Sequence, residues 1–368
     1  MFSEIYKNKT VLVTGHTGFK GSWLTVWLLK LGAKVVGFSK DIPSNPSMFV
    51  ELGLQKRIKH IIGDIRDIKH LSEVINNEKP QFVFHLAAQA IVSTSYLEPT
   101  ETMTTNIVGT MNILEVLRNY SNDCIAVMIT SDKCYDNVEW IWGYKETDHM
   151  GGKDIYSGSK GAAELVIKSY FHSYFQKGHP VKIVIGRAGN VIGGGDWASD
   201  RIVVDCMRAW NEGRSVEIRS PKATRPWQHV MEPLSGYLAV GASVFFNNLL
   251  HGEAFNFGPR AEQNHTVINL INMLAAKWGF NDINDAYKIT GNIPFHEAGL
   301  LKLNCDKALS YLKWESNLVY PETIQMVSEW YFGFYKNKLD MYKFTLKQIT
   351  EYEELGLARD RMWSKKNT

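Results

Sequence analysis

The sequence predicts an α/β protein built on a doubly wound parallel sheet, with a smaller C-terminal α/β lobe. From Thr10 to about Arg187, short β-branched runs alternate with longer helical patterns, which is typical of stacked βαβ units. After Gly193 the alternation gives way to stretches rich in Gly, Pro, Trp and His with apolar helices between them. We therefore expect three segments in the chain. They are a sheet domain, a lobe, and a polar helix with a tail, at residues 1–190, 191–335 and 336–368.

The individual elements follow from the length and periodicity of each apolar run. Strands need four to eight such residues, whereas helices show the wider 3.6-residue repeat. In chain order we expect a strand at Thr10–Thr14, a helix at Gly21–Leu31, strands at Lys34–Phe38 and Phe82–Leu86, a helix at Thr105–Arg118, a strand at Ile125–Thr130, and helices at Thr266–Trp278 and Glu322–Tyr335. Apolar residues cover more than one side of the Thr105–Arg118 helix, so a place inside the domain and a subunit interface both stay open. Beyond 336 the polar sequence predicts a surface helix and a frayed tail.

Composition excludes several classes of protein. The net charge of +3 and the 21% charged residues provide no basic field for nucleic acid or a membrane surface. The first apolar run, Val11–Val13, is too short for a signal peptide or a membrane span, so we expect a cytoplasmic protein. The four cysteines are scattered, which predicts reduced, buried thiols and no metal site.

Three glycines, Gly15, Gly18 and Gly21, stand three residues apart between the first strand and the first helix. Such a turn lets the backbone approach a pyrophosphate and directs the helix N-terminus at its charge. Tight turns also need glycine for conformational reasons alone, but the position after the first strand favours a Rossmann-type dinucleotide site. Thr17, Phe19 and Lys20 share this turn and belong to the predicted site.

The end of the second strand decides between NAD and NADP, because a carboxylate there binds the ribose 2′-OH and a cation binds a 2′-phosphate. Ser39, Lys40 and Asp41 follow the strand and supply both kinds of group, so the choice stays open. Asp64 is a candidate for the adenine amino group. The other cofactor-binding candidates are Ile65, Leu86, Ala87, Ala88, Gln89, Asn106 and Thr130.

Tyr156 and Lys160 lie four residues apart at the start of a helical pattern. This spacing places both on one helix face, where the ammonium lowers the pKa of the phenol and favours acid–base chemistry. The same spacing is frequent among surface residues. Behind a glycine fingerprint in a βαβ chain, it predicts a catalytic pair that also contacts the cofactor.

Ser131, Asp132 and Lys133 follow the buried run that ends at Thr130. Ligands bind at the carboxyl ends of strands in open α/β sheets, so catalysis is expected here. Neighbours on a strand face opposite ways, and Asp132 and Lys133 can both act only if the strand has already ended. The alternative is a solvated turn with a local ion pair.

These motifs, with Thr105–Thr110 and Arg187–Asn190, occur in the order found in the extended short-chain dehydrogenase/reductase family, which the chain resembles from Thr10 to about Trp330. The segments that most resemble its sugar-nucleotide 4,6-dehydratases are Thr130–Asn137, Gly194–Trp197, Arg225–Val230, His296–Ala298 and Leu301–Cys305. The resemblance implies an NAD cofactor, with NADP not excluded, and a homodimer or homotetramer built through the helices near Asn106 and Tyr156. It also implies deoxysugar biosynthesis for surface polysaccharide such as lipopolysaccharide O-antigen.

The resemblance also implies roles for the site residues. Tyr156 would remove the proton of the sugar 4-OH as the C4 hydride leaves, and Ser131 would hydrogen-bond the 4-oxygen. Asp132 would protonate the departing 6-OH. Many dehydratases carry glutamate at the position of Lys133, so Lys133 is either the C5 base or an orienting group.

Substrate-binding candidates are expected in the second lobe, where Arg225 would bind the diphosphate as a planar donor fork. The others are Asn190, Arg201, His229, His296 and Glu297. Two alternatives to a dehydratase remain from the sequence. An epimerase has no use for Asp132 and Lys133, and a non-catalytic nucleotide-binding protein has no use for Tyr156 and Lys160.

Overall fold

The computed structural model describes residues 1–290 and 300–365, and its centre is one parallel sheet. Within those residues the strands follow the order β11-β6-β5-β4-β1-β2-β3, and each neighbouring pair is parallel. The bounds are β1 Thr10–Thr14, β2 Lys34–Ser39, β3 Lys59–Ile62, β4 Phe82–His85, β5 Cys124–Ile129, β6 Val181–Ala188 and β11 Ala254–Phe257. The predicted doubly wound α/β fold is confirmed.

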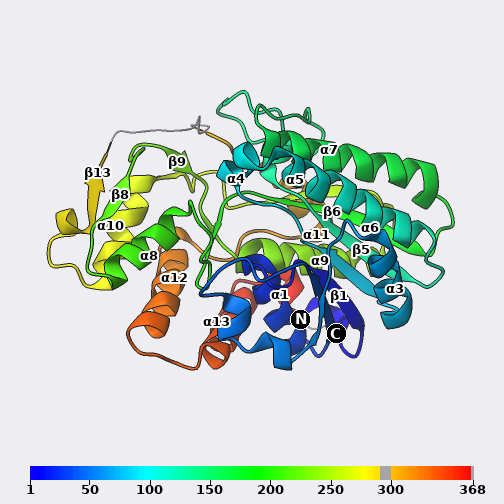
Figure 1. Cartoon of the computed structure of the whole chain (residues 1–368), viewed down its shortest axis with the longest axis horizontal. Helices are drawn as coiled ribbons and strands as arrows, with labels where there is room; N and C mark the ends of the chain where they lie inside the picture. The colour runs from blue at the N-terminus through cyan, green and yellow to red at the C-terminus, as the bar shows by residue number, and fades with distance from the viewer. Residues whose placement is uncertain (291–299, 366–368) are drawn as a thin grey trace.

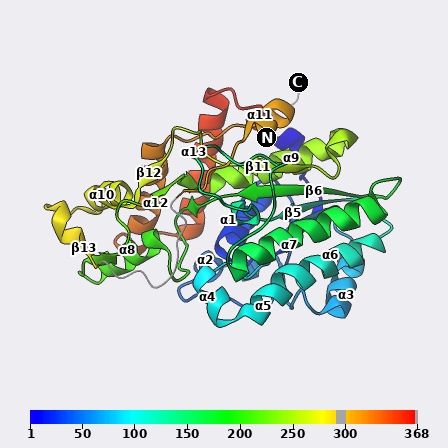
Figure 2. The ribbon, with the colours of Figure 1, turned by 90° about the horizontal axis from the view of Figure 1, so that it is seen from above.

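Helices cover both faces of this sheet (Figure 2). On one face lie α3 Ile68–Glu78, α6 Gly109–Arg118 and α7 Ile155–Tyr170, and on the other lie α1 Phe19–Lys30 and α9 Met231–Phe246. Alternate residues of β1 divide between the two cores, since Val11 and Val13 pack toward α1 while Leu12 packs toward α3 and α6. Burial on both faces explains why the strands are nearly continuous apolar runs.

The strand order reverses direction between β1 and β4. From β1 the chain proceeds outward through β2 and β3, then crosses back to β4 and continues through β5 and β6. Loops on opposite sides of such a switch point diverge, which leaves a crevice at the carboxyl ends of the strands. The fold therefore predicts a ligand site beside the β1–α1 turn.

A second lobe lies at the left of Figure 1. Its main elements are α8 Ile202–Asn211, β8 Val216–Ile218, α10 Val267–Trp278, β13 Tyr287–Ile289 and α12 Tyr320–Tyr335. The chain does not divide at a single point near 190, because α9 and β11 return to the central sheet before α10 begins. Nearly every residue of α9 is buried, as expected for a helix that is apolar all round.

Shorter elements connect these parts. They are α2 Met48–Glu51, α4 Val92–Leu97, α5 Pro99–Met103, β7 Val191–Ile192, β9 Thr224–Arg225, β10 Gln228–His229, β12 His265–Thr266 and α11 Asp306–Leu312. Among the described residues, none of the helices combines the length and the apolar composition that crossing a bilayer demands.

The C-terminal segment forms α13 Met341–Ala358, which packs against α1 and α12. Trp27 of α1 donates from Nε1 to Glu353 at 2.8 Å. Trp363, beyond the helix, is buried and stacks on Tyr352 with ring centroids 5.3 Å apart. The predicted helix is present, with one face buried and with Lys343 and Lys347 exposed on the other. The expectation of a frayed tail is wrong for residues up to 365, because Trp363 and Ser364 are buried.

Candidate active site

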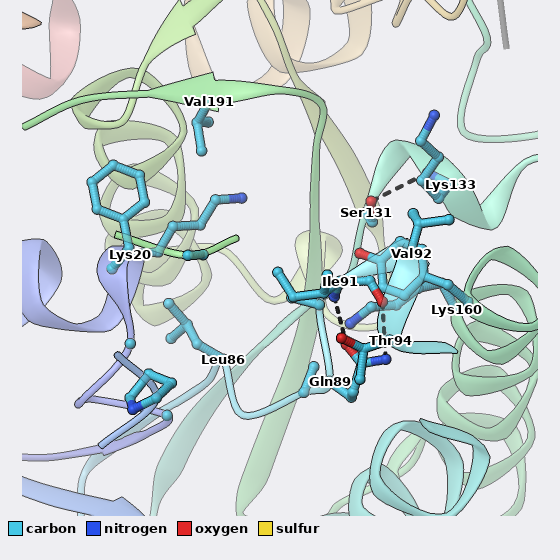
Figure 3. A pocket seen from close by; sticks show the side chains of 18 of the residues that line it. Lys20, Leu86, Gln89, Ile91, Val92, Thr94, Ser131, Lys133, Lys160 and Val191 are labelled. Atoms are coloured by element: carbon cyan, nitrogen blue, oxygen red, sulfur yellow. Dashed lines mark hydrogen bonds between the residues drawn. The ribbon is translucent and has the colours of Figure 1, made fainter. Parts of the chain in front are cut away.

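A cavity of about 880 Å³ lies at the switch point, between the carboxyl ends of the sheet strands and the second lobe. The β1–α1 turn and the ends of β2, β4, β5 and β6 form one side, and residues 195–201 form part of the other. Figure 3 shows Lys20 extending from the glycine turn into this space, with Ser131, Lys133 and Lys160 across from it. Its volume is at the upper end of the range usual for small-molecule sites.

The glycine turn leaves backbone open to the cavity. Gly15 has a φ of +75°, and a Cβ atom on it would lie 2.7 Å from the backbone nitrogen of Ala87. A Cβ on Gly21 would lie 2.1 Å from the carbonyl oxygen of Gly15. Gly18 precedes α1 and provides no side-chain cap, so the first N–H groups of that helix remain available. This cradle fits the pyrophosphate of a dinucleotide.

Lys20 is the charged residue of this turn. Burial and the nearby charge of Arg201 lower the pKa of its ammonium to about 8, while Asp132 opposes that shift. Lys20 was expected to contact the cofactor because of its place in the turn. Its position in the cavity brings its charge close to the catalytic candidates as well.

Ser39, Lys40, Asp64 and Ile65 line the cavity near the ends of β2 and β3, and their contact with the cofactor's adenosine stays a prediction. Thr17 fixes the loop after β2, because its hydroxyl donates to the carbonyl oxygen of Asp41 at 2.7 Å. Sequence reasoning missed Glu101, which reaches this wall from α5. No local pattern indicated it, since α5 is distant in sequence from β2.

Residues 86–89 run along the cavity after β4. Asn106, a predicted cofactor contact, instead supports this segment from behind. Its Oδ1 accepts from the Gln89 N–H at 2.8 Å, and its Nδ2 donates to the Gln89 carbonyl at 3.0 Å and to the Ser159 hydroxyl at 2.8 Å. Asn106 therefore joins the β4 loop to α7 and does not line the cavity.

Tyr156 and Lys160 lie on the first turns of α7, and both side chains reach the cavity. The Lys160 Nζ lies 5.9 Å from the centre of the Tyr156 ring. Burial raises the pKa of the Tyr156 phenol to about 12, and a hydrogen bond with Ser131 opposes that rise. Burial lowers the pKa of the Lys160 ammonium to about 8. The α7 N-terminus is fixed by Asp154, which accepts from the Ser157 N–H at 2.9 Å.

The polar turn after β5 brings Ser131, Asp132 and Lys133 to the same cavity. β5 ends at Ile129, and Ser131 caps a short 3₁₀ turn by accepting from the Lys133 N–H at 3.2 Å. The Ser131 hydroxyl donates to Asp132 Oδ1 at 2.9 Å. Because the strand ends before Asp132 and Lys133, their side chains need not point to opposite faces of the sheet. Both can therefore act in the same cavity, as the prediction from the sequence requires.

Asp132 is nearly buried and faces the loop after β6. A Cβ on Gly189 would lie 3.1 Å from Asp132 Oδ2, so the glycine of the Arg187–Asn190 motif makes room for this carboxylate. Lys133 is partly exposed, and its ammonium points away from Ser131 in Figure 3.

A buried ion pair lies directly beneath these residues. Glu164 of α7 and Arg187 of β6 are each 3% exposed, with Nε to Oε1 at 2.8 Å. The Thr130 hydroxyl donates to Glu164 Oε1 at 2.5 Å, and Arg187 Nη1 donates to the Tyr135 hydroxyl at 2.7 Å. The pair thus joins β5, β6 and α7 beneath the polar turn Ser131–Lys133. Thr130 also lines the cavity, where a cofactor contact was predicted.

On the lobe side, the substrate-binding candidates Asn190, Arg201 and Arg225 line the cavity, and so does Arg219, which was not predicted from the sequence. His229 is fully buried away from the described lining. Its ring packs edge-on against Trp23 with centroids 5.6 Å apart. The remaining two substrate candidates, His296 and Glu297, lie outside the described residues.

Comparison with known proteins agrees with this architecture. A family model described as GDP-mannose 4,6 dehydratase matches residues 12–327. The chain is 44% identical over 354 residues to CDP-glucose 4,6-dehydratase from Salmonella typhimurium, covering 95% of this chain and 97% of that protein. It is 24% identical to CDP-paratose 2-epimerase from Salmonella typhi, over 87% of this chain and 98% of that protein.

Solved structures show the same fold. An epimerase from Methanothermobacter thermautotrophicus superposes with a TM-score of 0.76 at 23% identity, covering 91% of this chain and 96% of that one. A dTDP-glucose 4,6-dehydratase from Streptomyces venezuelae, solved with NAD, gives a TM-score of 0.75 at 19% identity, over 89% and 99% of the two chains. Since the family model and the Salmonella typhimurium relative each span most of the sequence, the chain belongs to the GDP-mannose 4,6-dehydratase family of sugar-nucleotide dehydratases.

Proposed function

We propose that this protein uses NAD to convert CDP-D-glucose into CDP-4-keto-6-deoxy-D-glucose and water. The proposal rests on one observation, that two sets of candidate catalytic residues line the same cavity. Tyr156 and Lys160 lie there with Asp132 and Lys133, next to the glycine turn. The 44% identity to a CDP-glucose 4,6-dehydratase supports both the reaction and the cytidine base.

NAD fits the residues on the sheet side. Its pyrophosphate would lie on the Gly15–Gly21 turn, and its adenosine beside Ser39 and Asp64. When bound, NAD supplies the acceptor for the C4 hydride and the donor that returns a hydride to C6. The chain's own residues provide the proton transfers and hold the sugar.

Tyr156 is the base for the sugar 4-OH. A buried phenol is a weak base until its phenolate is stabilised. We assign this stabilisation to the Lys160 ammonium, whose Nζ lies 5.9 Å from the ring centre, and to the Ser131 hydroxyl once it turns from Asp132 to the phenol oxygen. The proton of the 4-OH passes to the Tyr156 oxygen as the C4–H bond breaks. The 4-ketone formed on the sugar makes the C5 proton acidic.

Asp132 and Lys133 serve the elimination. Asp132 gives a proton to the departing 6-oxygen, and its burial beside Gly189 keeps bulk water away from that oxygen. Lys133 is the candidate for removing the C5 proton. Its ammonium points away from Ser131 in Figure 3, so this assignment includes a rotation of the side chain toward the sugar.

The substrate's diphosphate is negatively charged, and the lobe side of the cavity carries Arg201, Arg219 and Arg225. One guanidinium group can donate two parallel hydrogen bonds to two oxygens of a phosphate. We assign these arginines to the diphosphate, with Asn190 beside the sugar.

The experiment that tests this function is an incubation of the purified protein and NAD with CDP-, dTDP-, GDP- and UDP-glucose in parallel, followed by mass spectrometry. We expect the loss of one water from CDP-glucose. Loss from a different nucleotide would keep the reaction and replace the substrate. Interconversion of hexoses without loss of mass would establish an epimerase, and tight binding without conversion would establish a non-catalytic protein.

We further infer a homodimer or homotetramer that contacts through α6 and α7. Val108 and Met111, beside and on α6, are 36% and 37% exposed, and Leu165 of α7 is 57% exposed. Apolar side chains on two adjacent helices are suited to an interface between copies. A cytoplasmic location and a role in deoxysugar synthesis for surface polysaccharide stay predictions from the sequence.

A further inference from the structure

Four charged side chains form a linked cluster at the adenosine end of the cavity. Lys40, after β2, contacts Glu101 of α5 with Nζ to Oε1 at 2.7 Å. Arg66, after β3, contacts the other oxygen of Glu101 and also pairs with Asp64 at 2.6 Å. Lys40, Asp64 and Glu101 line the cavity. Two cations and two carboxylates thus cancel each other's charge at this wall.

The end of β2 is where dinucleotide folds read the ribose 2′ position. β2 ends here at Ser39, whose hydroxyl bears no charge, and Lys40 comes next. A cation at this place binds a 2′-phosphate. Lys40 taken alone would favour NADP, whereas the Asp41 carboxylate beside it also lines the cavity and favours NAD. The end of β2 therefore leaves the choice open, and the ion pairs of Lys40 and Arg66 oppose the binding of a 2′-phosphate.

Glu101 is ionised in this cluster, because a hydrogen bond from Lys40 lowers the pKa of its carboxyl below the ordinary value. The hydrogen bond with Arg66 does the same for the pKa of Asp64. A 2′-phosphate would have to displace Glu101 from Lys40 and then stand beside both carboxylates. The 2′-hydroxyl of NAD requires no such displacement and can donate to a carboxylate.

We propose that Glu101 is a specificity-determining residue, which excludes NADP by keeping Lys40 and Arg66 in ion pairs. The inference rests on the proposed use of a nicotinamide dinucleotide and adds the residue that selects between its two forms. Glu101 belongs to α5, far from β2 in sequence, which is why the strand end alone left the choice undecided.

Stability is a poor explanation for the cluster. The Lys40 and Glu101 side chains are 47% and 32% exposed, and ion pairs at such exposure contribute little to the free energy of unfolding. The variant Glu101→Gln is therefore expected to fold. Its amide keeps the size of the side chain while releasing Lys40 and Arg66 from a charge partner.

The test is isothermal titration calorimetry of NAD and of NADP with the wild-type chain, with Glu101→Gln, and with the double variant Glu101→Gln/Lys40→Gln. Glu98→Gln is the matched control, because Glu98 is an exposed carboxylate next to the same helix and outside the cavity lining. We expect Glu101→Gln to raise the affinity for NADP relative to NAD by roughly 10-fold or more. The double variant should lose that gain, and the control should match wild type.

The outcomes separate this inference from the proposed function. If wild type binds NAD and the NADP-to-NAD ratio of Glu101→Gln equals that of wild type, the role of Glu101 is overturned while the function stands. A ratio that changes equally in Glu98→Gln overturns it too, since the effect would then be general charge. If wild type binds neither dinucleotide, the proposed cofactor and function fail first.

Discussion

Replacing Tyr156 with Phe is expected to lower kcat by about 10²–10⁴-fold, the usual contribution of a positioned acid or base. The substitution removes only the phenolic oxygen, the atom that accepts the 4-OH proton. Without it the C4–H bond cannot break with concerted loss of that proton. Binding of the nucleotide portion should change little, because we assign the diphosphate to Arg201, Arg219 and Arg225, which line the cavity on the lobe side.

The measurement has two parts: the rate of 4-keto sugar formation, followed by its absorbance in alkali, and the dissociation constant for CDP-glucose. Tyr174→Phe is the matched control, since this tyrosine lies beyond the same helix and is half exposed. A Tyr156→Phe variant with a wild-type rate would remove Tyr156 from the mechanism. A loss of binding as large as the loss of rate would make it a substrate ligand instead.

Replacing Glu164 with Gln is expected to lower the free energy of unfolding by about 3–5 kcal/mol, as observed when one partner of a buried ion pair is removed. The amide keeps the volume but leaves the Arg187 guanidinium without an opposite charge in the interior. Arg187 and Glu164 are each 3% exposed, so water cannot take the place of the missing carboxylate.

Urea denaturation followed by circular dichroism measures this effect. The control is Glu212→Gln, whose pair with Arg214 is exposed, and its transition should coincide with that of wild type. Because the Glu164–Arg187 pair lies beneath Thr130 and the polar turn Ser131–Lys133, we also expect Glu164→Gln to lower the rate of 4-keto sugar formation. Equal midpoints for Glu164→Gln and wild type would show that the pair carries no net stability.

Local pattern was sufficient for β1, β2, β4 and β5 of the central sheet, whereas β3, β6 and β11 were not individually predicted. The strands at Thr10–Thr14 and Lys34–Ser39 are short apolar runs bounded by turn residues, and the structure confirms them within a residue. The glycine turn was identified from the spacing of its glycines. The structure shows why glycine is needed there, because a Cβ atom on Gly15 or Gly21 would clash with backbone atoms. Tyr156 and Lys160 were found for a similar reason, since a spacing of four fixes a shared helix face.

What the sequence could not reveal are the partners that long-range packing brings together. Glu101 of α5 pairs with Lys40, which follows β2, although 61 positions separate them in the sequence. Glu353 of α13 is buried where it accepts a hydrogen bond from Trp27 of α1, 326 positions away in the sequence. His229 was expected at the substrate, and its aromatic packing against Trp23 could not be distinguished from a binding role by residue type alone.

The most direct test of the proposed reaction is the fate of one hydrogen. CDP-glucose carrying deuterium at C4 is incubated with the protein and NAD, and the product is analysed by nuclear magnetic resonance. We expect deuterium at C6 of the 4-keto-6-deoxy sugar, because the hydride taken from C4 is returned within the same active site. Deuterium still at C4 of a hexose, or lost to solvent, would contradict the oxidation, elimination and reduction sequence assigned to this site.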